Sequence, residues 1–204
     1  MFKNYSIYTC FSLIIILFSC TNSNTSKVPI KHQVDISVDG IFDAKEWECS
    51  KAINISQNNT LLLIQNVDYI FLGIKNNETT ARYVNLYIEN NTIGTINFHA
   101  SMQLSERQLS GIWNDTIPKW NWGNNSNWTA NKIKIISRDE TIPFIETVAL
   151  YEGFEFKIAK SKLKSNTFKI RLEIKDFIGK EEDIVFPIDS ERLTMEKWFQ
   201  LELY

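Results

Sequence analysis

Short stretches rich in Ile, Val, Phe, Tyr and Thr follow one another from position 34 to the end of the chain, separated by Asn, Asp, Gly and Ser. In 154–158 and 168–174, apolar residues occupy every second position, which is typical of a strand with one buried and one exposed face. We predict strands at 34–38, 52–56, 60–66, 69–75, 83–89, 92–100, 132–137, 144–150, 154–158, 167–175, 184–187 and 198–203. Many short strands with turn signals between them favour an all-β fold, an antiparallel jelly-roll-like β-sandwich.

Helical periodicity is weak throughout the chain. We expect one or two short helical turns, at 43–49 with Asp43 as the N-cap and at 159–163. Helix bundles and doubly wound α/β folds are therefore disfavoured.

With 44% hydrophobic residues, 23% charged residues and a net charge of -2, the 204-residue chain is unlike a disordered protein or a basic nucleic-acid binder, so we expect no nucleic-acid partner.

The first twenty residues have the features of a targeting signal. Lys3 precedes an apolar run at 11–18, which is too short to span a membrane as a helix and is typical of a signal peptide at 1–19. Leu17-Phe18-Ser19-Cys20 resembles a bacterial lipobox, which predicts lipid attachment at Cys20. The alternative is an ordinary signal peptide cut nearby or an uncleaved anchor.

If Cys20 is acylated, we expect the mature protein to be anchored by its N-terminal lipid in the outer membrane of the bacterial cell envelope, facing the periplasm. The polar segment 20–29 is then a flexible tether, and 30–204 forms one domain. Cys49 is the cysteine of this domain, so no internal disulfide is expected, and we predict that its thiol is buried and inert. Trp47 is predicted to be a structural residue at one end of the sandwich.

A pattern of short motifs resembles family 9 carbohydrate-binding modules and their DOMON-like relatives. It begins with Asp39-Gly40 followed by Trp47 and continues, in the order of the family, over nearly all of the rest of the chain. The later matching segments are 66–74, 85–90, 152–158 with Leu163, and 198–203. The resemblance implies a jelly-roll-like sandwich that binds an oligo- or polysaccharide without catalysis, alongside a separate glycan-processing enzyme. Glu89-Asn90 replaces the Asp expected at an acidic turn, so we expect no cofactor, with a structural calcium ion as the open alternative.

The segment 111–128 holds four of the six tryptophans, interleaved with asparagines and almost free of charge. Sugars present apolar C–H faces rimmed by hydroxyls, which suit flat aromatic rings beside amides that donate and accept hydrogen bonds. In an extended backbone, Trp120 and Trp122 would share a face. The alternative is that the tryptophans anchor a long loop in the sandwich. The candidate ligand-binding residues are Trp113, Trp120, Asn121, Trp122, Asn125 and Trp128.

Acidic pairs are few, and they fall in predicted turns beside Lys or Arg, where a solvated role is expected rather than glycosidase chemistry. The chain has no phosphate-binding Gly-rich loop, no Gly-x-Ser-x-Gly and no His-Glu-x-x-His. We therefore predict a non-enzymatic, lipid-anchored, glycan-binding protein. The alternative from another class is a structural or protein-interaction lipoprotein that keeps the fold without a sugar site.

Overall fold

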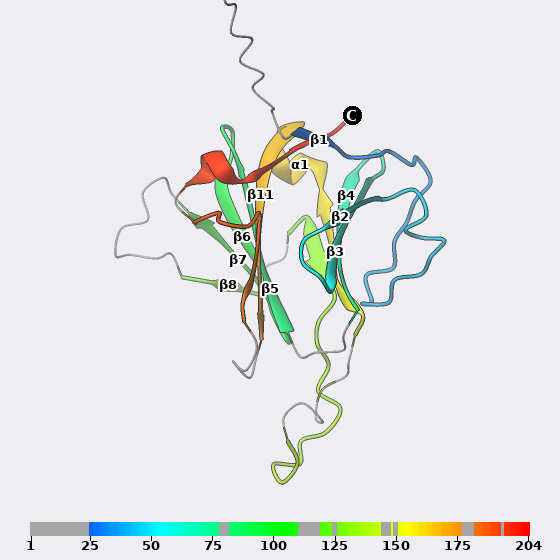
Figure 1. The fold of residues 1–204 in the computed structure, drawn as a ribbon, viewed down its shortest axis with the longest axis vertical. Helices are drawn as coiled ribbons and strands as arrows, with labels where there is room; N and C mark the ends of the chain where they lie inside the picture. The colour runs from blue at the N-terminus through cyan, green and yellow to red at the C-terminus, as the bar shows by residue number, and fades with distance from the viewer. Residues whose placement is uncertain are drawn as a thin grey trace, which may run out of the picture.

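Two β-sheets pack face to face in the computed structural model (Figure 1). The structure describes residues 25–77, 82–109, 119–123, 126–143, 148, 151–176, 182–192 and 194–204. The strands are short and mostly antiparallel, which confirms the prediction of an all-β sandwich. The predicted signal peptide and Cys20 lie outside the described residues.

The first sheet has the strand order β1-β13-β11-β5-β6-β7-β8, and β12 also pairs with β11. All of its pairs are antiparallel except that of β1 with β13. Its strands are β1 (Thr25–Lys27), β5 (Arg82–Asn90), β6 (Gly94–Ala100), β7 (Leu104–Leu109), β8 (Asn121–Trp122), β11 (Thr167–Asp176), β12 (Ile184–Phe186) and β13 (Phe199–Glu202).

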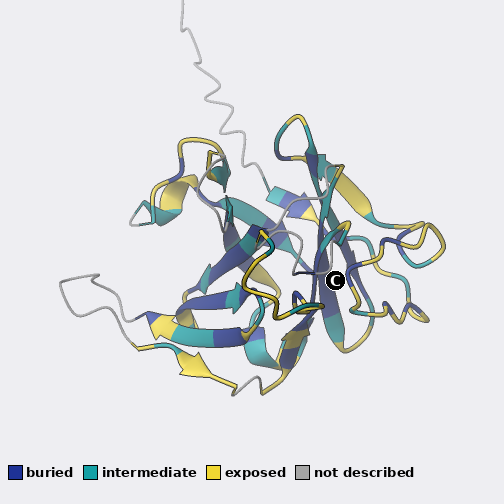
Figure 2. Cartoon of the chain, turned by 90° about the horizontal axis from the view of Figure 1, so that it is seen from below, coloured by how far each residue is buried: buried dark blue, intermediate teal, exposed yellow. Residues whose placement is uncertain are grey.

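The second sheet has the order β2-β3-β4-β10-β9 and is antiparallel throughout. Its strands are β2 (Lys51–Asn54), β3 (Asn59–Gln65), β4 (Tyr69–Asn76), β9 (Trp128–Ala130) and β10 (Gly153–Ala159). The apolar side chains that alternate along both sheets meet in one core, to which β5 contributes Leu86 and β10 contributes Phe156. Figure 2 shows the buried strands in the centre of the molecule and exposed loops around them.

Several predicted elements differ from the observed ones. Residues 34–38 and 132–137 form no strand, although Val34 and Ile36 are buried against the outer face of the second sheet. The short strands β7, β8 and β9 were not predicted, and 144–147 lie outside the described residues. β1 falls within 20–29, the range assigned to a tether, so Thr25–Lys27 belong to the first sheet.

One of the two predicted helical turns is present, and the other is not. α1 (Lys160–Leu163) lies where a turn was predicted, whereas 43–49 forms turns without a helix, and the described residues also contain the 3-10 helix η2 (Met195–Lys197). None of the helices in the described part of the chain has the length and apolar character to cross a membrane.

The motif residues that carry the family resemblance meet on the outer face of the second sheet. The carboxylate of Glu155, which is 1% exposed, accepts hydrogen bonds from the backbone N–H groups of Asp39 and Gly40 and from the Trp47 indole N–H, at 3.0, 2.8 and 3.0 Å. Burial raises the pKa of Glu155 to about 7, against the lowering effect of these donors. Gly40 adopts φ +85°, a conformation that favours glycine. The motif therefore fastens the 39–47 segment to the sheet.

Trp47 is buried, so the structure gives it a packing role. Its ring lies 5.6 Å from that of Phe42 over the outer face of the second sheet. The prediction for Cys49 is wrong, because its thiol is exposed. The Trp47 side chain packs against the second sheet and donates a hydrogen bond to Glu155. Cys49, two residues later in a non-helical turn, faces solvent.

Candidate functional site

The short strand β8 places two tryptophans on the outer face of the first sheet, the face turned away from the core. Asn121 pairs with Glu106 and Trp122 pairs with Ser105. Glu106 in turn lies opposite the core residue Phe98, so Ser105 and Trp122 belong to the outer face. Residues two apart in an extended strand point the same way, which puts Trp120 beside Trp122.

Strands β5 and β6 supply the neighbours of these tryptophans. Tyr83, His99, Trp120 and Trp122 form what we call the aromatic cluster. The ring centroid of His99 lies 5.4 Å from that of Tyr83, 5.3 Å from that of Trp120 and 5.7 Å from that of Trp122. The two indoles lie 6.0 Å apart at 44°. His99 is thus the centre around which the other three rings are arranged.

The aromatic cluster is open to solvent at its β8 side. Trp122 is 51% exposed, Asn121 is exposed, and Trp120 is half-buried. On the other side of Trp120, the Arg107 guanidinium carbon lies 4.0 Å from the ring centroid, a cation–π stack. The solvent-facing ring area of the cluster therefore belongs mainly to Trp122.

Hydrogen bonds fix the imidazole of His99. Its Nδ1 lies 2.8 Å from Asn85 Oδ1, and its Nε2 lies 3.0 Å from Ser101 Oγ. Asn85 directs its Nδ2 to Glu173, so its Oδ1 is left to accept from His99 Nδ1–H. Burial, aided by the positive charge of Arg107, lowers the pKa of His99 to about 4. The ring is therefore neutral at physiological pH and donates from Nδ1 only.

A charged network lies beside the aromatic cluster on the same face. The Glu173 carboxylate is 3% exposed and accepts hydrogen bonds from the guanidinium groups of Arg171 and Arg192 and from the Tyr87 hydroxyl. Burial alone would raise the pKa of Glu173, but the bonds from Arg192 and Arg171 lower it to about 2. Burial and the nearby Glu173 charge raise the pKa of Tyr87 to about 12.

Residues 187–192 and 194–198 cover part of this face, and Arg192 belongs to the network. The Trp198 ring packs edge-on at 5.9 Å from that of Tyr87, and its indole N–H donates to the Glu191 carbonyl. Arg171 Nε donates to the Ser190 carbonyl. The aromatic cluster and the charged network are thus held by long-range contacts rather than by one loop.

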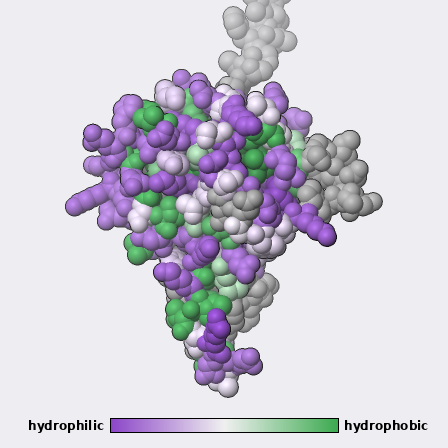
Figure 3. All heavy atoms as spheres, turned by 180° about the vertical axis from the view of Figure 1, so that it is seen from behind, coloured by the Kyte–Doolittle hydropathy of each residue, from purple (hydrophilic) through white to green (hydrophobic). Residues whose placement is uncertain are grey.

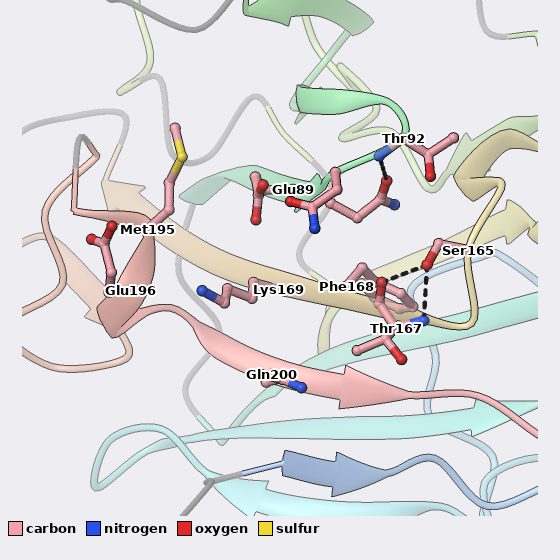
Figure 4. A pocket seen from close by; sticks show the side chains of 11 residues that line it. Glu89, Thr92, Ser165, Thr167, Phe168, Lys169, Met195, Glu196 and Gln200 are labelled. Atoms are coloured by element: carbon pink, nitrogen blue, oxygen red, sulfur yellow. Dashed lines mark hydrogen bonds between the residues drawn. The ribbon is translucent and has the colours of Figure 1, made fainter.

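A separate cleft of about 610 Å³ lies beside the β5–β6 turn (Figure 4). Its walls come from the β5–β6 turn, the start of β11, β13 and η2, and are mostly polar, with Glu89, Thr92, Lys169, Glu196 and Gln200 among them. Its one aromatic residue, Phe168, is 1% exposed and belongs to the core. Because the cleft has no exposed ring on which a sugar could stack, the aromatic cluster is the better candidate site.

Trp128, predicted as a ligand-binding residue, is instead a core residue, and that prediction is wrong. It is 5% exposed and lies opposite Ile158 in the β9–β10 pair. Its ring meets Phe98 of the first sheet edge-on at 4.8 Å and stacks on Phe156 of the second at 6.3 Å. Trp128 therefore joins the two sheets.

The other predicted ligand-binding residues fall into two groups. Trp120 and Trp122 lie together at the edge of the outer face, whereas Asn121, which pairs with Glu106, belongs to the opposite face of the sheet. Trp113 and Asn125 lie outside the described residues. The sequence analysis missed Tyr83, His99 and Arg107. Tyr83 and His99 could have been found from the alternation of aromatic and polar residues with apolar core residues in β5 and β6. Their contact with β8 depends on a strand register that the local sequence does not specify.

No grouping of three His, Cys, Asp or Glu side chains that could hold a metal ion is found within the described residues. Glu89 and Asn90, at the turn where the resemblance left a structural calcium open, lie at the cleft, and Asn90 uses its side chain on backbone groups at Thr92, Ile93 and Leu163.

No protein-family model matches the chain, and no curated protein matches it in sequence. One solved structure is similar, that of a "putative carbohydrate-binding protein" from Bacteroides uniformis ATCC 8492. It shares 10% sequence identity over 88% of this chain and 99% of that chain, with a TM-score of 0.47.

Proposed function

We propose that this protein binds a carbohydrate without catalysis at the edge of the first sheet, with Trp122 as the platform. The observation that carries the proposal is that Trp122 is 51% exposed on the outer face of the first sheet, with the Trp120 ring 6.0 Å away. An exposed aromatic ring offers the apolar face of a sugar a stacking surface.

The support behind the platform favours binding by a preformed surface. Trp120 is stacked between Arg107 and the rest of the aromatic cluster, and His99 is fixed by two hydrogen bonds. A site whose side chains are already held loses less conformational entropy when the ligand arrives. This arrangement suits recognition by ring stacking.

The carboxylates near the site support a binding role rather than glycoside hydrolysis. A glycosidase needs a carboxylic acid that is protonated at neutral pH to protonate the leaving group. Glu173 has the opposite character, because two guanidinium groups lower its pKa to about 2. Glu155, whose pKa is raised to about 7, is enclosed on the outer face of the other sheet and already accepts three N–H groups.

We also propose that the protein is a lipoprotein of the bacterial cell envelope, acylated at Cys20, and that it works beside a separate glycan-processing enzyme. β1, the first described strand, lies at one end of the sandwich, and the projection at 131–143 lies at the opposite end (Figure 1). A membrane anchor next to β1 would leave the β8 edge accessible from the side.

A relationship to family 9 modules is supported by the way Asp39, Gly40 and Trp47 converge on Glu155.

The test is a glycan array with the purified protein, followed by calorimetric titration of the glycans that bind. Trp122→Ala should weaken binding about three- to tenfold or more, since ring stacking adds about 0.5–1.5 kcal/mol beyond area burial. Tyr204→Ala is the matched control, because Tyr204 is 62% exposed at the far end of the chain and should not matter. Failure of the unmodified protein to bind any glycan would refute the proposal.

A second candidate, protein interaction, is favoured by the projection at 131–143. Apolar atoms gather on this projection (Figure 3), where Ile135 and Ile136 are exposed. Exposed apolar side chains that lie together are typical of contact sites. Under this candidate, Ile135→Ser with Ile136→Ser abolishes a partner complex and leaves glycan binding intact; a complex that survives the double substitution excludes the projection as its interface.

A further inference from the structure

Three buried polar groups without hydrogen-bond partners lie beside Trp120 on the outer face of the first sheet. Asn97 and Ser105 are both 0% exposed, and neither the amide of Asn97 nor the hydroxyl of Ser105 has a partner among the described residues. Arg107 Nε is likewise buried and unpartnered. In the sheet, Asn97 lies directly opposite Arg107, and Ser105 lies two residues before Arg107 on β7.

Buried polar groups without partners are unusual, since each costs about 1–3 kcal/mol relative to a hydrogen-bonded group. Here two of them, on Asn97 and Ser105, neighbour Arg107 in the sheet, and the third is Nε of its half-buried guanidinium. No acidic side chain of the described chain forms an ion pair with Arg107, and Glu173, the carboxylate of this face, is taken by Arg171 and Arg192. Arg107 hydrogen-bonds to Tyr87 and feels the charge of Glu173, but within the described residues it has no carboxylate of its own as an ion-pair partner.

The charge balance of this region differs from that of the whole chain. The protein has a net charge of -2, yet the network of Arg107, Arg171, Arg192 and Glu173 has three guanidinium groups for one carboxylate. His99 is neutral and adds nothing to it. A local positive potential attracts an anion, and the planar fork of a guanidinium matches a carboxylate in particular.

We infer that the glycan bound at Trp122 is acidic, and that Arg107 pairs with the carboxylate of a uronic acid unit in it. The inference rests on the proposed function and specifies its ligand class. Trp120 connects the two parts of the site, because Arg107 is stacked 4.0 Å from its ring centroid and the Trp122 ring lies 6.0 Å away from it. A glycan that extends from Trp122 along Trp120 therefore approaches the half-buried guanidinium.

The experiment compares oligogalacturonate with its methyl ester, which has the same backbone without the charge. The purified protein should bind the acid about ten- to hundredfold more tightly than the ester, the ratio expected of a hydrogen bond to a charged group. The preference should shrink as salt is added, because screening weakens an exposed ion pair.

Three variants separate the possible causes. Arg107→Gln should remove the preference, so that acid and ester bind equally. Lys134→Gln makes the same change of charge at an exposed position on the projection and should leave the preference intact. Trp122→Ala should weaken both ligands alike.

Equal binding of acid and ester, or a preference that survives Arg107→Gln, would overturn the inference and leave the proposed function standing. The same holds if neither ligand binds while a neutral glycan on the array does. If no glycan binds at all, the proposed function and the inference fall together.

Discussion

Trp128 and Trp122 come from the same tryptophan-rich segment, but the structure gives them opposite roles, and replacing each by Ala should separate them. Trp128 is 5% exposed and lies between Phe98 and Phe156, so its removal leaves a cavity between the two sheets. We expect Trp128→Ala to lower the free energy of unfolding by about 3–5 kcal/mol, the range for a buried aromatic residue. For a domain of this size, the melting temperature would drop by about 6–20 °C.

Trp122→Ala removes a ring that is about half in solvent, and we expect it to change the free energy of unfolding by about 1 kcal/mol or less. Urea denaturation followed by circular dichroism measures both variants, and Trp128→Phe, which keeps a ring between the sheets, should lose less than half as much as Trp128→Ala. Should Trp122→Ala destabilise the protein as much as Trp128→Ala, or Trp128→Ala cost less than about 1 kcal/mol, the division between core and surface tryptophans would be refuted.

Three further predictions concern titration and reactivity. His99 should titrate near pH 4 by NMR, and titration near 6.5 would contradict the buried neutral ring. Because the unfolded imidazole has a pKa of about 6.5, the contribution of the neutral ring to stability is lost as the pH falls from about 6.5 through 4. Glu173→Gln should lower the free energy of unfolding by about 3–5 kcal/mol in urea, because Arg171 is left buried without its anion, and a loss below about 1 kcal/mol would contradict this. The Glu173 contribution is present above its unfolded pKa of about 4.5 and is lost as pH falls through about 2. Cys49 should react with a thiol reagent in the folded protein as fast as in urea, whereas strong protection would show that it is buried.

The strands that could be predicted from sequence are those with one buried and one exposed face over several residues, such as β10 and β11. Strands β8 and β9 are two and three residues long, too short to show a period. Residues 34–38 do alternate, and Val34 and Ile36 are buried, but they pack on a sheet face without joining the hydrogen-bonded ladder. Alternation thus reports burial more directly than it reports strand pairing.

The tryptophan-rich segment shows the same limit for the candidate site. Composition indicated an aromatic surface among amides, and local geometry indicated that Trp120 and Trp122 would point the same way. Composition could not distinguish Trp128, which is turned into the core by its pairing with Ile158. Nor could it find His99 or Arg107, which meet Trp120 only through the long-range register of β6, β7 and β8.

The most direct test of glycan binding at the β8 edge is to follow the indole N–H resonances of the tryptophans by NMR while a glycan selected on the array is titrated into the protein. Binding at Trp122 should shift the resonances of Trp122 and Trp120 and leave those of the buried Trp47, Trp128 and Trp198 in place. Shifts confined to the buried tryptophans, or a bound glycan that moves neither Trp120 nor Trp122, would contradict the assignment of the site.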